Sequence, residues 1–255
     1  MLFRYERSWL KRAPFVVGAA LLAALAVTGC RCSRGASKGA PPAVTATVTR
    51  LDAPAPQVVS LTSRGGVTLE ASQWTRGAST APAIVLVHRL AGSRAEWGGL
   101  IPELFASPGD LTVLALDLRG HGGSRQKDPT GKLSGWRELG ASDYAAMGDD
   151  VLAAVAHLRQ GGVTRPVALV GSDLGATAVC LAGGKVGAGL AGIALVSPGG
   201  ALRGVDLFEP FAQLKSHPVW LAVGQEDAVS LAATRTLEKM SPTAKLLVLP
   251  SSAHG

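Results

Sequence analysis

Cysteine is scarce in this sequence. Its 255 residues contain three, Cys30, Cys32 and Cys180. No C-x-x-C pair and no Cys/His cluster is present, so the sequence indicates neither a disulfide framework nor a structural zinc site, and no metal is predicted. The glycine-rich stretch 120–123 lacks the Walker pattern, so neither a nucleotide site nor any other cofactor is expected. Cys180 lies in an apolar stretch, which favours a small buried core residue.

Net charge is missing from most of the chain. The whole chain carries +7, but residues 1–50 hold eight Lys/Arg and one Glu. The other 17 basic and 17 acidic residues cancel. Residues 51–255 therefore lack the basic excess that nucleic-acid binding would require, and we predict no nucleic-acid partner.

The N-terminal residues are typical of an export signal. Four basic residues precede an apolar, uncharged run over residues 14–29, which is short for a membrane span and suits a signal-peptide core. The run ends Val27-Thr28-Gly29-Cys30, which resembles the bacterial lipobox. The resemblance implies cleavage before Cys30 and acylation of Cys30, so that acyl chains would anchor the protein to a membrane. An uncleaved signal anchor or a chance cysteine is the alternative.

This interpretation divides the chain into three parts. Residues 1–29 are predicted to be a lipoprotein signal peptide, and residues 30–56, rich in Ala, Pro, Ser, Thr and Gly, a flexible tether. Residues 57–255 form the predicted folded domain. The expected location is the bacterial cell envelope. Arg31, in place of the aspartate that resembles an inner-membrane retention signal, favours the outer membrane if the bacterium is Gram-negative. The oligomeric state stays open.

Strand and helix patterns alternate from residue 57 onward. Segments 57–63 and 67–74, on either side of Arg64-Gly65-Gly66, predict a β-hairpin. Short continuous apolar runs are typical of strands buried on both faces, and they lie at 84–87, 113–117, 167–171, 193–197, 219–224 and 245–250. Helical patterns lie at 94–106, 142–159, 174–184 and 230–240. The order predicts an α/β fold with a mostly parallel eight-stranded sheet flanked by helices, and function at the carboxyl ends of its strands.

Two expectations concern the helix over 142–159. Ser142 can cap its N-terminus. Asp149 and Asp150 look like a carboxylate pair, but adjacent helical residues point about 100° apart, so a solvated face is the preferred interpretation.

Two motifs carry a resemblance to a known family. The strand at 167–171 runs into Gly171-Ser172-Asp173-Leu174-Gly175, which has the G-x-S-x-G frame of a sharp strand-to-helix turn, with Asp173 at its tip. The strand at 113–117 runs into Asp117-Leu118-Arg119-Gly120-His121-Gly122-Gly123-Ser124. With an aspartate and a histidine following in that order, the chain resembles the α/β-hydrolase family over nearly all of residues 57–255.

The resemblance implies roles for particular residues. Asp173 stands at the nucleophile position, Asp227 at the position of the acid and His254 at that of the base. The backbone N–H groups of Leu90 and Leu174 would form the oxyanion hole. Residues of the turns, His88, Arg119 and His121 among them, would shape loops.

The sequence departs from the family in several places. Arg89 stands where most members have glycine, and the tip residue is aspartate. The sequence ends one residue after His254, so the family's final helix is expected to be missing. Only about twenty residues, 198–217, separate two predicted strands where other members insert a cap, so no large cap domain is predicted.

The tip residue limits the chemistry. A carboxylate attacking an acyl carbon would give a mixed anhydride, and it leaves more readily than the alcohol it displaces, so ester hydrolysis through Asp173 is uphill. A carboxylate can instead attack saturated carbon, as in the haloalkane dehalogenase and epoxide hydrolase branches, after which the histidine activates water. Those branches usually have Trp after the nucleophile and aromatic donors in a cap, whereas Leu174 follows here. Ser172, one residue before the tip, is not expected to point at His254.

The sequence thus predicts a hydrolase acting on a small ester-like or alkyl substrate through Asp173, His254 and Asp227. The alternative is a non-catalytic lipoprotein that binds a ligand or partner at the cell envelope.

Overall fold

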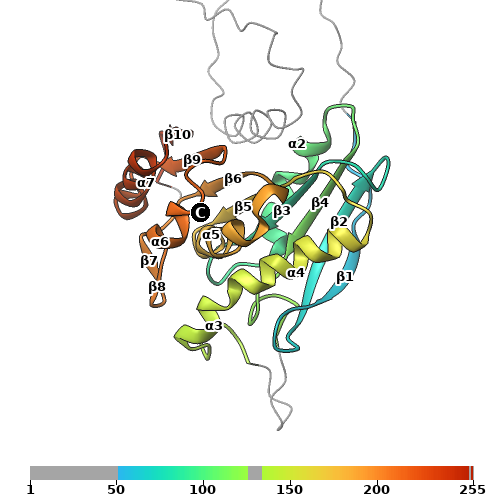
Figure 1. The fold of residues 1–255 in the computed structure, drawn as a ribbon, viewed down its shortest axis with the longest axis horizontal. Coiled ribbons are helices and arrows are strands. Elements are labelled where there is room, and N and C mark those ends of the chain that lie inside the picture. Colours follow the sequence, from blue (N-terminus) through green and yellow to red (C-terminus); the bar gives the residue numbers. More distant parts are fainter. Residues whose placement is uncertain (1–50, 126–133, 253, 255) are drawn as a thin grey trace, which may run out of the picture.

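A central eight-stranded sheet dominates the computed structural model, which describes residues 51–125, 134–252 and 254 (Figure 1). β2 is antiparallel to both of its neighbours, and every other pairing in this sheet is parallel. The predicted α/β-hydrolase arrangement is therefore confirmed. In spatial order the strands are β1 (Gln57–Thr62), β2 (Thr68–Arg76), β4 (Leu111–Leu116), β3 (Ala83–Val87), β5 (Val167–Ser172), β6 (Leu190–Val196), β9 (Val219–Gly224) and β10 (Ala244–Leu249).

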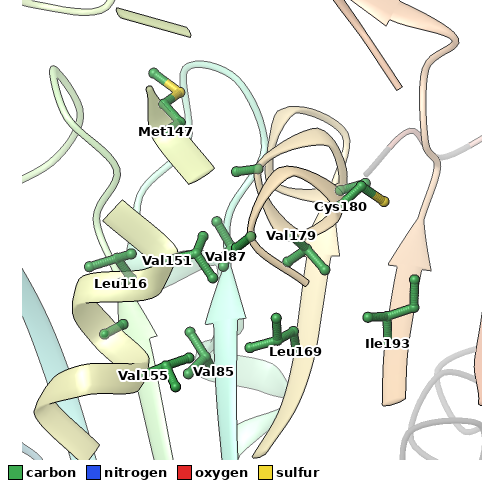
Figure 2. Close-up of a cluster of buried hydrophobic side chains, with 14 of the residues drawn as sticks. Val85, Val87, Leu116, Met147, Val151, Val155, Leu169, Val179, Cys180 and Ile193 are labelled. Carbon is green, nitrogen blue, oxygen red and sulfur yellow. The ribbon is translucent and has the colours of Figure 1, made fainter. Parts of the chain in front are cut away.

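Helices cover both faces of the sheet. Side chains of α4 (Met147–Gln160), α5 (Leu174–Val186) and α7 (Ala228–Met240) join the larger apolar cluster. Figure 2 shows part of it, with Val151 of α4 near Val87 of β3 and Val155 of α4 near Val85. The opposite face packs on η2 (Arg94–Gly99) and α2 (Ile101–Phe105).

Strand β3 shows why its sequence is continuously apolar. Val85 and Val87 belong to the larger cluster, whereas Ile84 and Leu86 belong to the cluster under η2 and α2. Successive strand side chains point to opposite faces, and both faces are covered, so neither set meets water. Cys180 of α5 lies in the larger cluster, as predicted (Figure 2).

The expected helix over 142–159 is two helices. α3 (Ala141–Ala145) and α4, which begins at Met147, are separated by Ala146. The expected cap at Ser142 is wrong, because Gly140 is the N-cap residue and Ser142 lies inside α3. The Asp143 carboxylate accepts the Gly140 N–H at 2.9 Å. The Tyr144 hydroxyl donates to the Trp136 carbonyl at 2.6 Å, which fastens α3 to the preceding loop.

The segment between β6 and β9 is short but structured. After the 3₁₀ turn η3 (Gly187–Gly189) and β6, it forms the small hairpin β7 (Ala201–Leu202) and β8 (Val205–Asp206), then α6 (Phe208–Ala212). Phe211 is fully buried in the larger cluster. This segment packs onto the domain and is no cap domain.

The predicted signal peptide and Cys30 lie outside the described residues. Leu51 donates its N–H to the Ala106 carbonyl at 3.2 Å, and Ala53 packs against the cluster under η2 and α2, ahead of the predicted boundary at residue 57. Over the described ranges, no helix is both long enough and apolar enough to cross a membrane.

Candidate active site

The turn between β5 and α5 is sharply bent at Asp173. Its backbone has φ 47° and ψ −106°, a conformation that costs a non-glycine residue about 1–3 kcal/mol. Two glycines permit the bend. A Cβ on Gly171 would lie 2.2 Å from the Gly175 carbonyl oxygen, and one on Gly175 would lie 2.2 Å from the Val87 carbonyl oxygen. Asp173 therefore stands at the tip of a strained turn, at the carboxyl end of a central strand.

The two carboxylate oxygens of Asp173 meet different groups. Oδ2 accepts the backbone N–H of Leu90 at 3.1 Å. Oδ1 lies 3.6 Å from Nε2 of His254, within ion-pair range but longer than a hydrogen bond. The side chain keeps a small exposed fraction of 11%.

His254 lies between two aspartates. Its Nδ1 is 2.7 Å from Oδ2 of Asp227 and 3.2 Å from Oγ of Ser230. An ionised carboxylate can only accept, which assigns the proton to Nδ1 and leaves Nε2 facing Asp173. The imidazole is half exposed.

Asp227 is held by the start of α7. It is the N-cap residue and accepts the Ser230 N–H at 3.2 Å. Although burial opposes ionisation, the hydrogen bonds from His254 and Ser230 lower the pKa of Asp227 below its ordinary value. Asp227 is thus an anion that orients the imidazole.

The predicted oxyanion donors lie at this tip. The Leu90 N–H donates to Asp173 itself. Leu174 is the first residue of α5, so its N–H has no acceptor within the helix. The structure therefore brings together all five predicted site residues, Asp173, Asp227, His254, Leu90 and Leu174.

His88 fixes the loop that carries Leu90. Nδ1 of His88 is 2.7 Å from the Arg89 carbonyl, and Nε2 accepts the Leu118 N–H at 3.1 Å. Burial lowers the pKa of His88 to about 4. This neutral histidine joins the loops after β3 and β4, which agrees with a loop-shaping role.

Glu96 is a residue of the site that the sequence did not single out. Its Oε2 accepts the backbone N–H of Arg89 at 3.2 Å and lies 3.4 Å from the Arg89 Nε. Burial raises the pKa of Glu96, and the charge of Asp173 adds to that rise. The unusual Arg89 was the one signal that could have prompted a search for a carboxylate partner. Ser172 is buried and makes no hydrogen bond to His254.

Arg119 and Asp150 form a buried ion pair. Asp150 is fully buried and accepts the Arg119 backbone N–H at 3.1 Å and the guanidinium NH2 at 2.6 Å. The expectation that Asp150 is solvated is therefore wrong. The side chain of Asp149, about 100° around α4, is partly exposed and pairs with Lys185 at 3.3 Å. The partner of Asp150 is Arg119, which belongs to the turn after β4. Helical periodicity could not predict this contact between elements distant in sequence.

Among the described residues, no group of three or more His, Cys, Asp or Glu side chains is arranged to hold a metal ion.

Comparison with known proteins agrees with the fold. The family model described as "alpha/beta hydrolase fold" matches residues 82–253, more than half of the chain. The chain belongs to the α/β-hydrolase family. In the comparison with curated proteins, no sequence matches.

Solved structures similar to this α/β-hydrolase include two esterases and a hydrolase. An esterase from a Rhodococcus species is 21% identical, with a TM-score of 0.56, covering 75% of this chain and 89% of that one. A thermophilic esterase from Thermogutta terrifontis is 19% identical, with a TM-score of 0.56, covering 78% and 91%. A hydrolase from Pseudomonas aeruginosa is 16% identical, with a TM-score of 0.59, covering 76% and 91%. At these identities the likeness concerns the fold.

Proposed function

We propose that this protein is a hydrolase that forms a covalent ester between Asp173 and a saturated carbon of a small substrate. One observation carries the proposal: the two oxygens of Asp173 have different partners. Oδ2 rests on the Leu90 N–H, and Oδ1 faces His254. A carboxylate nucleophile needs one oxygen held by a hydrogen-bond donor and the other available to attack the substrate.

In the first step, Oδ1 of Asp173 attacks the saturated carbon. A carbon–oxygen bond forms, the bond to the leaving group breaks, and the leaving group departs with the bonding electron pair. Oδ2 becomes the carbonyl oxygen of an alkyl ester and stays beside the Leu90 N–H.

In the second step, Nε2 of His254 takes a proton from water, and the hydroxide attacks Cγ of Asp173. Negative charge then develops on Oδ2, where the N–H groups of Leu90 and Leu174 stabilise it. Collapse breaks the bond between Cγ and the alkyl oxygen. The alkoxide takes the proton from His254, which leaves Asp173 as a carboxylic acid. Asp173 then releases this proton to solvent and returns as a carboxylate. Asp227 stabilises the imidazolium throughout.

The same contacts disfavour acyl esters. The Leu90 N–H is already engaged by Asp173, so an oxyanion on an acyl substrate would have to compete with a built-in carboxylate. This adds to the instability of a mixed anhydride. The esterase names of similar structures are thus a weaker guide to this chain than its own tip residue.

The experiment is turnover of a panel of haloalkanes and epoxides by the purified domain, beside p-nitrophenyl esters. We expect alkyl turnover by the parent, loss of about 10³-fold or more in Asp173→Asn, and no change in Asp149→Asn, a matched aspartate outside the site. His254→Gln should retain the first step, so that intact mass shows an alkyl adduct on Asp173.

A folded parent that turns over no alkyl substrate, with no adduct in His254→Gln, would overturn the proposal. That result would support the second candidate, a non-catalytic binding protein. The hydrogen bond from the Leu90 N–H to Asp173 favours this candidate as well. In a non-catalytic protein, the Asp173 carboxylate would occupy the position where an active enzyme binds the oxyanion of its substrate. Gain of His254-dependent esterase activity in Asp173→Ser would show that the frame is otherwise intact.

We also propose that Cys30 anchors the protein in the bacterial cell envelope, with a small-molecule substrate as its partner. The lipobox-like sequence supports this. The full chain should fractionate with membranes and Cys30→Ser should not; equal partitioning of both would contradict the anchor.

A further inference from the structure

Two consecutive backbone N–H groups of the loop after β3 donate to two different carboxylates. The Arg89 N–H donates to Glu96 at 3.2 Å, and the Leu90 N–H donates to Asp173 at 3.1 Å. Glu96 comes from η2, and Asp173 comes from the turn after β5. The loop is therefore held from two sides by groups distant in sequence.

The surroundings of Glu96 are built for close contact with this loop. Its Oε2 would lie 2.7 Å from a Cβ on Gly92, so only glycine allows the carboxylate this near to the backbone. The Gly92 N–H closes a turn onto the Arg89 carbonyl at 3.0 Å, and Ala91 within that turn has φ 60°. The side chain of Glu96 is 17% exposed, whereas that of Arg89 is half exposed.

We infer that Glu96 is a positioning residue, which holds the loop through the Arg89 N–H so that the Leu90 N–H stays directed at Oδ2 of Asp173. The inference rests on the proposed function for its effect on turnover. Its effect on the loop does not depend on any substrate.

Glu96 matters most after Asp173 has been alkylated. The free carboxylate of Asp173 attracts the Leu90 N–H by its own charge. An alkyl ester is neutral, so this attraction weakens at the stage when the N–H must await a developing oxyanion. Glu96 stays ionised beside Arg89 and keeps the loop in place. Ester hydrolysis should therefore depend on Glu96 more than ester formation does.

A partly buried carboxylate with a raised pKa also costs stability. Folding makes ionisation of Glu96 less favourable than in the unfolded chain, so ionised Glu96 lowers the free energy of unfolding at neutral pH. Groups facing Glu96 are the Arg89 guanidinium, the Asp173 carboxylate and Ser172.

The test uses Glu96→Ala, Glu96→Gln and Arg89→Gly, with Glu238→Gln as control, since Glu238 forms an exposed ion pair with Arg235 on α7. Quenched-flow mass spectrometry follows the alkyl adduct. In Glu96→Ala we expect ester hydrolysis to slow about 10- to 100-fold, ester formation to change less, and the adduct to accumulate. Glu96→Gln should rescue part of the rate, and its thermal midpoint should equal or exceed the parent's. Arg89→Gly, which keeps the backbone donor, should change hydrolysis less than Glu96→Ala.

A second readout needs no substrate. Amide-resolved hydrogen exchange should show faster exchange at Leu90 in Glu96→Ala than in the parent, with the core of β3 unchanged and Glu238→Gln identical to the parent. Unchanged exchange at Leu90 would overturn the inference, whatever the enzyme does. Faster exchange in a protein that forms no adduct would uphold the loop-positioning role while rejecting the proposed function. Equal slowing of both chemical steps would show that Glu96 acts on the fold rather than on the Leu90 N–H.

Discussion

Three buried aspartates of this molecule differ in what surrounds them. Asp117 and Asp150 are buried, and arginines with backbone N–H groups bind them. The Arg94 and Gly123 N–H groups donate to Asp117 at 2.6 and 2.8 Å, and the Arg94 guanidinium adds an ion pair. Asp173 is also mostly buried, yet one N–H and a half-exposed imidazole are its contacts.

This difference separates structural from chemical carboxylates. A carboxylate whose oxygens are all bound by cations and N–H groups is fixed and unreactive, because attack would require breaking those bonds. Asp173 keeps one oxygen free of strong donors, on a backbone that is strained rather than relaxed. The exposed fractions alone do not separate Asp117, Asp150 and Asp173, because all three are buried.

Asp150→Ala should have the largest effect on stability. It leaves the Arg119 guanidinium buried without its partner, which typically costs about 3–5 kcal/mol. Urea unfolding of parent and variant would measure the loss. Asp149→Ala, one residue away in a partly exposed pair, should cost less than about 1 kcal/mol. Equal losses in the two variants would mean that the buried pair contributes no more than the exposed one.

His88 extends this comparison to a residue that lies beside the site but resembles the structural carboxylates. Both of its ring nitrogens are bonded, although it belongs to the loop that carries Leu90. The unfolded chain takes up a proton near pH 6.5, whereas burial lowers the folded pKa to about 4. The unfolded state therefore binds more protons between these values. His88 should remove about 1.4 kcal/mol of stability for each pH unit as the pH falls from about 6.5 to about 4. Above pH 6.5 it should have no effect.

Urea unfolding at several pH values would check this slope, with His88→Asn as the comparison. The variant should be less stable at neutral pH but lose less stability on acidification than the parent. Parallel curves would show that folding does not lower the pKa of His88.

Asp173→Gly should have the smallest effect, and in the opposite direction. Glycine adopts a positive φ without the steric cost that Asp173 bears, so the free energy of unfolding should rise by about 1 kcal/mol while activity is lost. Asp173→Ala removes the same carboxylate but keeps the strain, so it should be less stable than the glycine variant. If the Asp173→Ala variant is as stable as the Asp173→Gly variant, the turn stores no strain.

The strand and helix pattern of the domain could be predicted because it depends on local periodicity. β3 and β5 were evident as continuous apolar runs, since both faces of a central strand are buried. Their order along the chain placed Asp173, Asp227 and His254 at the same edge of the sheet. The break at Ala146 could not be predicted, because the apolar pattern continues through it.

The sequence by itself determined the strand and helix order and the turn at Asp173, because motif spacing and burial patterns are properties of neighbouring residues. The resemblance to the α/β-hydrolase family supplied the residues expected around that turn. Only the tertiary structure decided which partner each charged group takes. Asp150 joined Arg119 across 31 residues, Leu90 joined Asp173 across 83, and Glu96 joined the loop that presents Leu90. Hydrogen bonds of a few ångströms are set by packing between elements distant in sequence, and no local pattern records that packing.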